Sequence, residues 1–205
     1  MKTEAVITGD IINSSFLSEE QKTLVRLNLE QYSTRNPDIL LPLQFYRGDS
    51  FQLMVKKEKA ARTAVFIEAI ICSSVSTFAR ISIGIGAVSK IVPENVLQSE
   101  GEAFQLSGHQ MDTMKEEGRL IKIALNNNQY QSILSATFYL AESIILGWKP
   151  GMASVIAQIP FAKTQKEIAE KLNISSAAVS KALKAGNWPS VENFMNGYEE
   201  TLKEI

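Results

Sequence analysis

Residues 164–184 read TQKEIAEKLNISSAAVSKALK. Apolar residues recur in this run at helical spacing in two segments, which predicts short helices over residues 164–172 and 175–185. Asn173 lies between the segments, where a left-handed backbone is needed and asparagine is tolerated. Ser175 is placed to cap the second helix. The run therefore predicts a helix-turn-helix.

The second predicted helix exposes short or cationic side chains, as a helix that enters the major groove of DNA does. The residues expected to contact DNA are Gln165, Lys166, Ser175, Ser176, Ala177, Ser180, Lys181 and Lys184. From Lys163 to Trp188 five lysines stand against two glutamates, which leaves a local net charge of +3. A patch of this size gives one copy a modest, salt-dependent affinity, so we expect a homodimer to bind DNA. The alternative is a helical hairpin that packs against a partner protein.

The whole chain has the composition of an ordinary soluble protein, with 205 residues, 45% of them hydrophobic and 21% charged. Its net charge of −1 excludes a protein that coats nucleic acid without sequence preference. The one cysteine, Cys72, lies in an apolar run and is expected to be a buried thiol. We see no targeting segment and no stretch that could span a membrane, so the expected location is the cytoplasm, with no membrane partner.

The order of predicted elements before residue 126 is β-α-β-β-α-β-α-β, which favours a sheet with helices packed on it. The strands are expected over residues 4–12, 41–47, 51–56, 80–88 and 119–125, and the helices over residues 18–35, 59–78 and 99–116. Ser18 and Gln21 form a capping-box pattern that opens the first of these helices. Gly84 and Gly86 share one face of a strand, which indicates close approach by a helix or ligand. All later elements are predicted helices, so we expect two domains, residues 1–128 and 129–205.

Two Gly-Asp pairs are the candidate chemical site of the N-terminal part. Asp10 follows a predicted buried strand, and Asp49 lies at the tip of a predicted hairpin. If these strands are neighbours, both carboxylates reach one edge of the sheet. Two carboxylates and backbone carbonyls form an oxygen site that suits Mg²⁺ and phosphate-bearing ligands. Aspartate after glycine is also common in plain turns, so both interpretations remain open.

Four short motifs occur in an order that resembles the SatD family. They are VITGDI (residues 6–11), RGDSFQ (47–52), IGIG (83–86) and EGEAFQ (100–105). The resemblance covers nearly the whole chain and implies a C-terminal helix-turn-helix. The N-terminal element order also resembles the class III nucleotide cyclase and polymerase-palm folds. The implied fold class is α+β, a ferredoxin-like or cyclase-like sheet with packed helices, followed by an all-α helix-turn-helix domain.

The same resemblance implies a metal site. In cyclase-like proteins the two matching aspartates hold metal ions, so Asp10 and Asp49 would be ligands, with the Ile11 carbonyl as a third and Mg²⁺ as the cofactor. Three positions depart from the cyclase pattern. Phe45 stands where a purine-selecting lysine is usual, and Gln105 and His109 stand near the usual asparagine and arginine. Cyclase activity is therefore not expected.

The sequence favours a DNA-binding transcriptional regulator whose N-terminal domain dimerises and senses a metal-bound nucleotide. One alternative is an enzyme that acts on a nucleoside triphosphate through its two aspartates. The other is a protein-interaction module that has neither DNA binding nor metal dependence. The three hypotheses depend on sites rather than on the fold.

Overall fold

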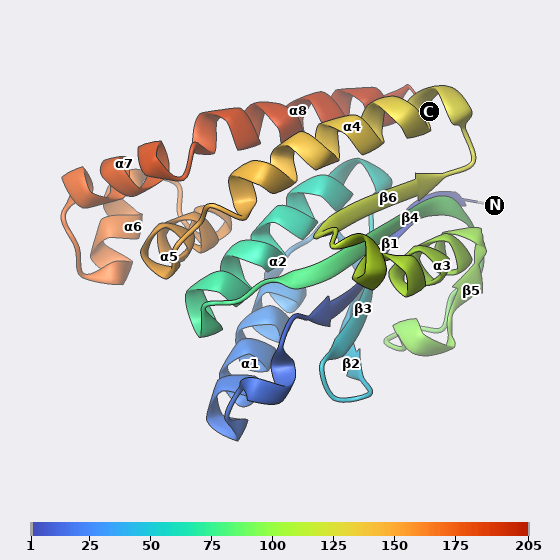
Figure 1. Cartoon of the computed structure of the whole chain (residues 1–205), viewed down its shortest axis with the longest axis horizontal. Coiled ribbons are helices and arrows are strands. Elements are labelled where there is room, and N and C mark those ends of the chain that lie inside the picture. Colours follow the sequence, from blue (N-terminus) through green and yellow to red (C-terminus); the bar gives the residue numbers. More distant parts are fainter. Residues whose placement is uncertain (1, 205) are drawn as a thin grey trace.

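The strand β1, which carries the first Gly-Asp pair, lies in the middle of a curled, mostly antiparallel sheet (Figure 1). The structure is a computed structural model that describes residues 2–204. The strands are β1 (Lys2–Ile11), β2 (Ile39–Tyr46), β3 (Ser50–Val55), β4 (Ala79–Lys90), β5 (Glu100–Gly101) and β6 (Ile121–Leu125). Their order is β2-β3-β1-β4, and both β5 and β6 pair with β4, β6 in parallel. The predicted α+β class is confirmed.

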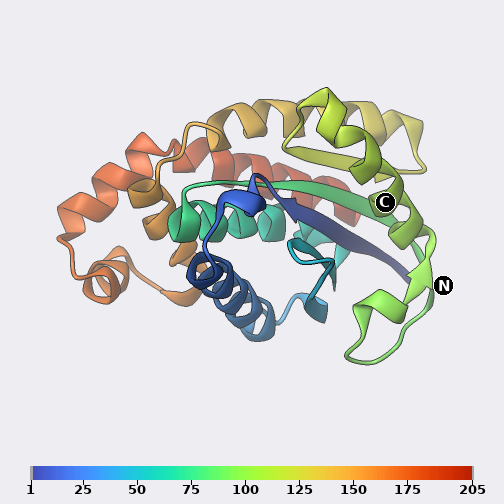
Figure 2. The ribbon, with the colours of Figure 1, turned by 60° about the horizontal axis from the view of Figure 1, so that its bottom comes forward.

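Helices cover both faces of this sheet. They are α1 (Glu19–Arg35) and α2 (Ala60–Val75) on one face and α3 (Glu102–Glu117) on the other (Figure 2). Residues alternate along β1, so that Ala5 and Ile7 join the core under α2, while Val6 packs in a second cluster with Ala103 of α3. The serine that was expected to open α1 does so, because Ser18 and Gln21 form a reciprocal capping box.

The predicted close approach at Gly84 is a helix contact. A Cβ atom at this position would lie 2.2 Å from the carbonyl oxygen of Ala103 and 2.5 Å from the amide nitrogen of Ser107, both in α3. The start of α3 is also fixed by Glu102, whose carboxylate accepts a hydrogen bond of 3.0 Å from the Ala87 amide. The glycine of β4 thus determines how closely α3 can pack on the sheet.

The rest of the chain is helical, as predicted. The elements are α4 (Asn128–Ile145), α5 (Pro150–Ala157), α6 (Gln165–Leu172), α7 (Ser176–Ala185) and α8 (Trp188–Lys203), with short 3₁₀ turns η1 (Ser14–Phe16), η2 (Lys57–Lys59), η3 (Val96–Gln98) and η4 (Ile159–Phe161). Within residues 2–204, no helix has the length and apolar character needed to cross a membrane.

These helices do not form the separate all-α unit that was predicted. One cluster of buried residues runs from β1 to α8. Trp188 of α8 lies 5.9 Å from the ring of Phe66 in α2, and Glu199 accepts hydrogen bonds of 2.6 Å from both Lys59 and Arg62. The physical reason is that α2 is apolar on nearly all sides, so it is buried between the sheet and the C-terminal helices.

The single thiol has the predicted environment. Cys72 is buried in α2, and its sulfur lies 3.7 Å from the carbonyl oxygen of Trp148. Burial raises the pKa of the Cys72 thiol to about 11, so the thiolate is scarce at neutral pH. Trp148 is buried as well, and its indole nitrogen donates to the Gly186 carbonyl at 2.9 Å.

A buried acid in α2 gives a testable pH dependence. One carboxylate oxygen of Glu68 accepts from the Ala79 amide at 3.0 Å, while Oε1 has no partner among the described residues. Burial raises the pKa of Glu68 well above 4.5, and the charge of Glu142 adds to the rise. The folded pKa exceeds the unfolded one, so stability is fully present below the unfolded pKa and is lost as pH rises towards the folded pKa.

We therefore expect the free energy of unfolding of Glu68→Gln, measured by urea titration at pH 8, to exceed that of the wild type by about 1 kcal/mol or more. The difference should shrink towards pH 4, where wild-type Glu68 is protonated in both states. An advantage that grows as the pH falls would contradict this account of Glu68.

Candidate functional site

The two Gly-Asp carboxylates meet where β1 ends beside the β2–β3 hairpin. In the β1–β3 register Asp10 pairs with Ser50, the residue after Asp49. The Ile11 amide donates to the Asp49 carbonyl at 3.4 Å, which ties the end of β1 to the turn. Gly48 adopts φ 87°, a left-handed conformation that favours glycine. The hairpin turn therefore places Asp49 beside Asp10.

The environment of Asp10 reflects this pairing. Burial raises the pKa of Asp10, and the neighbouring charge of Asp49 raises it further. The Ser50 hydroxyl, which donates to Asp10 at 3.3 Å, and the Arg80 guanidinium, at 3.5 Å, oppose part of this rise. The Ser14 hydroxyl donates to the carboxylate of Asp49. Asp10 thus carries more proton at mildly acidic pH than an ordinary aspartate.

A cavity of about 330 Å³ opens between the start of α1 and the hairpin. It is lined by Ile11, Ser14, Ser15, Leu17, Glu19, Lys22, Val25, Arg26, Gly48 and Asp49. Arg26 donates to the Gly48 carbonyl, and its guanidinium carbon lies 4.7 Å from the centre of the Phe45 ring. The cavity therefore holds Arg26 and Lys22 beside Asp49, with Lys22 paired to Glu19 at 2.7 Å. Carboxylate and cationic groups together suit a metal ion with phosphate oxygens.

The donor set fits a Mg²⁺ ion that keeps part of its water shell. Asp10 and Asp49 supply oxygen ligands, and Mg²⁺ in proteins commonly uses one or two carboxylates with waters or phosphates. Among residues 2–204 no group of three or more histidine, cysteine, aspartate or glutamate side chains could hold a metal ion. Ile11 is the last residue of β1, and the ligand role of its carbonyl stays a prediction.

The three residues that depart from the cyclase pattern have other surroundings. Phe45 packs edge-on against Phe51, with ring centres 5.8 Å apart, so it belongs to the hairpin's own packing. Gln105 and His109 are exposed on α3 and line a second cavity of about 420 Å³, together with Tyr46 and Arg47 of the hairpin. Neither residue contributes to the carboxylate pair.

Sequence reasoning missed three neighbours of the carboxylates: Ser14, Arg26 and Arg80. No motif marks them, because each reaches the site through tertiary structure. Arg80 could have been found from strand register, since it pairs directly with Asp10 between β1 and β4. The sequence alone does not fix that register.

Helices α6 and α7 are joined by a tight turn at Asn173, where the sequence predicted one. Asn173 adopts φ 52° and ψ 47°, the left-handed conformation that the turn needs. The Ser175 hydroxyl accepts from the Ala178 amide at 3.1 Å, as a helix cap does. Ile168 and Val179 are buried against each other and against α5. The two helices and the α5 helix thus form a small packed unit at one end of the molecule (Figure 1).

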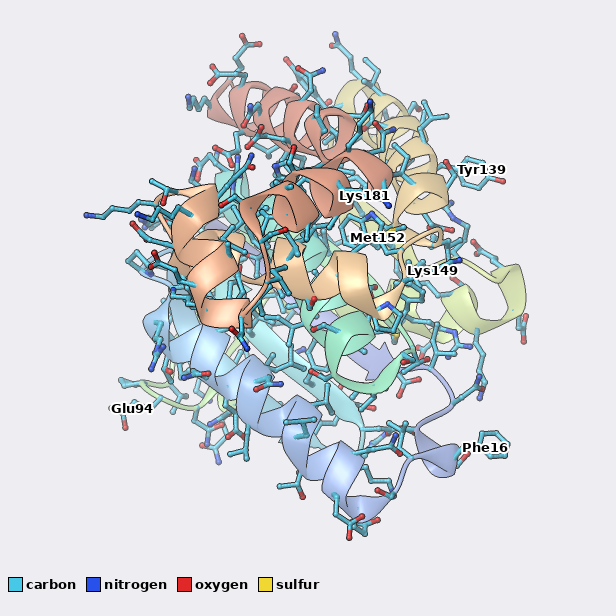
Figure 3. All side chains as sticks on the ribbon, turned by 90° about the vertical axis from the view of Figure 1, so that its left-hand side faces the viewer. Phe16, Glu94, Tyr139, Lys149, Met152 and Lys181 are labelled. Atoms are coloured by element: carbon cyan, nitrogen blue, oxygen red, sulfur yellow. The ribbon has the colours of Figure 1, made fainter. Side chains whose placement is uncertain are left out.

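All the residues predicted to contact DNA are on the surface. Those exposed are Gln165, Lys166, Ser175, Ser176, Ala177, Ser180, Lys181 and Lys184. Figure 3 faces this end of the molecule and shows Lys181 on α7, with Lys149 on the same side. Among the described residues neither Lys181 nor Lys184 has a carboxylate within 4.0 Å. Lys171 differs, because it donates to the Phe161 carbonyl.

Comparisons with known proteins give one family match. The model of the SatD family matches residues 5–191. Among curated proteins no match was found. Two structures of a bacterial light-regulated adenylyl cyclase are similar, each at 11% sequence identity. The first has a TM-score of 0.42 and covers 60% of this chain and 42% of the cyclase chain. The second has a TM-score of 0.38 and covers 59% of this chain and 74% of the cyclase chain. A regulator of polyketide synthase expression from Bifidobacterium adolescentis has a TM-score of 0.30 at 12% sequence identity, and the match covers 97% of this chain and 80% of the regulator. The chain spans less than half the length of the first cyclase chain.

Proposed function

The chain belongs to the SatD family, and from the exposed face of α7 we propose that it is a DNA-binding transcriptional regulator. The observation that carries the proposal is the pair of α6 and α7, joined by a left-handed turn at Asn173, with the outer face of α7 free of acidic residues. In a helix-turn-helix, the second helix enters the major groove.

The side chains of α7 suit this role. Ser176, Ala177 and Ser180 are short, so the first two turns of the helix can approach base edges closely. Lys181 and Lys184 follow on the same face and are long enough to reach phosphates. The glutamates of α6 do not pair with these two lysines, because Glu167 accepts from the Lys163 amide at 2.9 Å and Glu170 lies 4.0 Å from Lys166.

Salt dependence tests the proposal. If two copies each place Lys181 and Lys184 on phosphates, about four contacts form. Binding of the whole chain to a fluorescent duplex should then weaken by about 100-fold between 50 and 200 mM salt. Fluorescence anisotropy measures this change. An affinity that does not change with salt would contradict phosphate contacts by α7.

We propose as a second function that Asp10 and Asp49 hold a divalent cation that binds phosphates. The observation that favours it is the electrostatic coupling of Asp10 to Asp49, which lines one cavity with Lys22 and Arg26. When bound, such a cation neutralises phosphate charge and fixes the phosphates in place. Lys22 and Arg26 would contact the remaining phosphate oxygens. Nucleotide sensing by the N-terminal part is the role that we propose for this site.

We expect Mn²⁺ or Mg²⁺ to raise the thermal midpoint of the wild type, and the gain to be absent in Asp10→Asn. Without metal, Asp10→Asn should be at least as stable as the wild type at pH 7, because it removes a partly buried charge beside Asp49. Metal affinity should fall as the pH is lowered through the raised pKa of Asp10, since protonation removes the ligand. Differential scanning fluorimetry with and without metal measures these effects.

The matched control is Glu116→Gln on the exposed side of α3, which should keep the full metal response. Equal stabilisation of Asp10→Asn and the wild type by metal would refute the site.

A further inference from the structure

The outward side of α4 carries no charge. Its one charged residue, Glu142, points inward and accepts from Arg119 at 3.2 Å and from the Ile121 amide at 3.0 Å. The exposed residues are Asn128, Gln129, Ser132, Ile133, Ala136, Tyr139, Leu140 and Ser143. Leu140 is 67% exposed and Ile133 57%. A helix that faces only water normally has charged residues on that side, so this face is suited to a partner.

A groove continues this uncharged surface onto α8. It has a volume of about 390 Å³ and lies between α4 and α8, which run side by side (Figure 1). Its lining includes Thr137 and Ile144 of α4 and Phe194 and Gly197 of α8, and none of its lining residues is charged. At Gly197 a Cβ atom would have nothing within 4 Å. The α4/α8 face is the set of exposed and half-buried residues Ile133, Thr137, Leu140, Ile144, Phe194 and Gly197.

We propose that a second copy of this chain docks on the α4/α8 face, with twofold symmetry. In such an interface the same patch meets itself, so a charge near the axis would face its own like charge or be buried without a partner. An uncharged face avoids both costs. It also has no charged group that could pair with a charged partner, so a second copy is the better occupant. The face also carries an exposed leucine, Leu140, and a position without a side chain, Gly197, on the two sides of the groove.

The dimensions suit a dimer. The 18 residues of α4 and the 16 of α8 make helices of about 27 and 24 Å at the usual rise per residue. With axes about 8–10 Å apart, the two helices present a footprint of about 500 Å² before side-chain relief is added. A biological interface buries at least about 1,000 Å² in total, or about 500 Å² per partner, so the face has the minimum size for a dimer, below the standard of about 800 Å² per partner.

A dimer formed here would also fix the two α7 helices relative to each other. The junction between α7 and α8 is held to the segment after α4 by the hydrogen bond from Trp148 to the Gly186 carbonyl, and the buried Trp188 anchors the start of α8 in the core. Such a rigid link transmits the dimer geometry to α7. This consequence rests on the proposed DNA binding, but the dimer itself does not.

Sedimentation velocity of the whole chain without DNA, from 1 to 100 µM, tests the dimer. We expect the wild type to dimerise in this range and Leu140→Glu to weaken dimerisation by at least about 100-fold, because it buries two like charges. The control is Leu27→Glu on α1, whose side chain is similarly exposed at 58% and which should dimerise like the wild type. Gly197→Glu, on the other side of the groove, should repeat the effect of Leu140→Glu.

Salt separates the dimer from DNA binding, since an uncharged interface should not weaken between 100 and 500 mM NaCl, whereas phosphate contacts should. A wild type that is monomeric at 100 µM would overturn the proposal. So would folded Leu140→Glu and Gly197→Glu variants that dimerise as well as Leu27→Glu. The interface is supported if the wild type and Leu27→Glu dimerise while Leu140→Glu and Gly197→Glu do not, whether or not the protein binds a duplex. If no duplex binds in that case, only the proposed DNA-binding function fails.

Discussion

Reversing the charge of Lys181 and Lys184 is expected to weaken duplex binding by at least about 100-fold and to reduce the salt slope by about 2 for each copy bound. Both lysines are exposed on α7 and have no carboxylate within 4.0 Å in the described part of the chain. Glutamate at these positions replaces two phosphate contacts by repulsion. Anisotropy titrations at several salt concentrations measure both quantities.

The control variant carries the same change in net charge on other surfaces, as Lys90→Glu with Lys115→Glu. Both residues are exposed, on β4 and α3, away from α6 and α7. It should bind DNA nearly as well as the wild type. If the two double variants lose affinity equally, binding depends on overall charge, and α7 is not the recognition helix.

Replacing Gly84 with valine is expected to lower the free energy of unfolding by about 3 kcal/mol or more. The added Cβ would lie 2.2 Å from a backbone oxygen and 2.5 Å from a backbone nitrogen of α3. Backbone atoms cannot rotate away as a side chain can, so α3 must move off the sheet and open the cluster around Val6 and Ala103. Urea unfolding monitored by circular dichroism measures the loss.

Gly108→Ala is the matched control, because it lies in the same helix and its Cβ would meet nothing within 4 Å. Alanine in a helix interior should raise stability by about 0.5–1 kcal/mol. A Gly84→Val protein as stable as the wild type would contradict the seating of α3 on β4.

The predictable parts of the fold are those set by neighbouring residues. The Ser18–Gln21 capping box and the Asn173 turn depend on a few adjacent side chains, and both occur as predicted. The paired glycines of β4 also indicated a close contact correctly. The two-residue strand β5 was not predicted, because an element that short has no hydrophobic period.

The shared core could not be predicted in the same way. The shared core is held together by contacts between residues more than 100 positions apart in the chain, such as Phe66 with Trp188 and Arg62 with Glu199. A change from mixed to all-helical structure indicated a domain boundary, but it carried no information on which helix faces pack together. The domain boundary between residues 128 and 129 stays a prediction.

The two candidate sites differ in how far the sequence predicts them, again because one depends on neighbouring residues and the other on distant ones. The α6–α7 surface is local in sequence, so the exposure of all eight predicted residues followed from helical period. The carboxylate pair depends on strand pairing, and the sequence indicated the aspartates but not Arg80, Arg26 or Ser14. Register and side-chain reach, rather than residue type, determine those neighbours.

The most direct test of the proposed DNA-binding function is hydrogen exchange of the whole chain with and without a saturating duplex. The amides of α6 and α7 should exchange more slowly with DNA, because the duplex covers their outer faces and holds the turn at Asn173. The amides of α1, on another part of the surface, should be unaffected. Unchanged exchange over residues 165–185, with duplex-induced protection elsewhere, would contradict DNA recognition by α7.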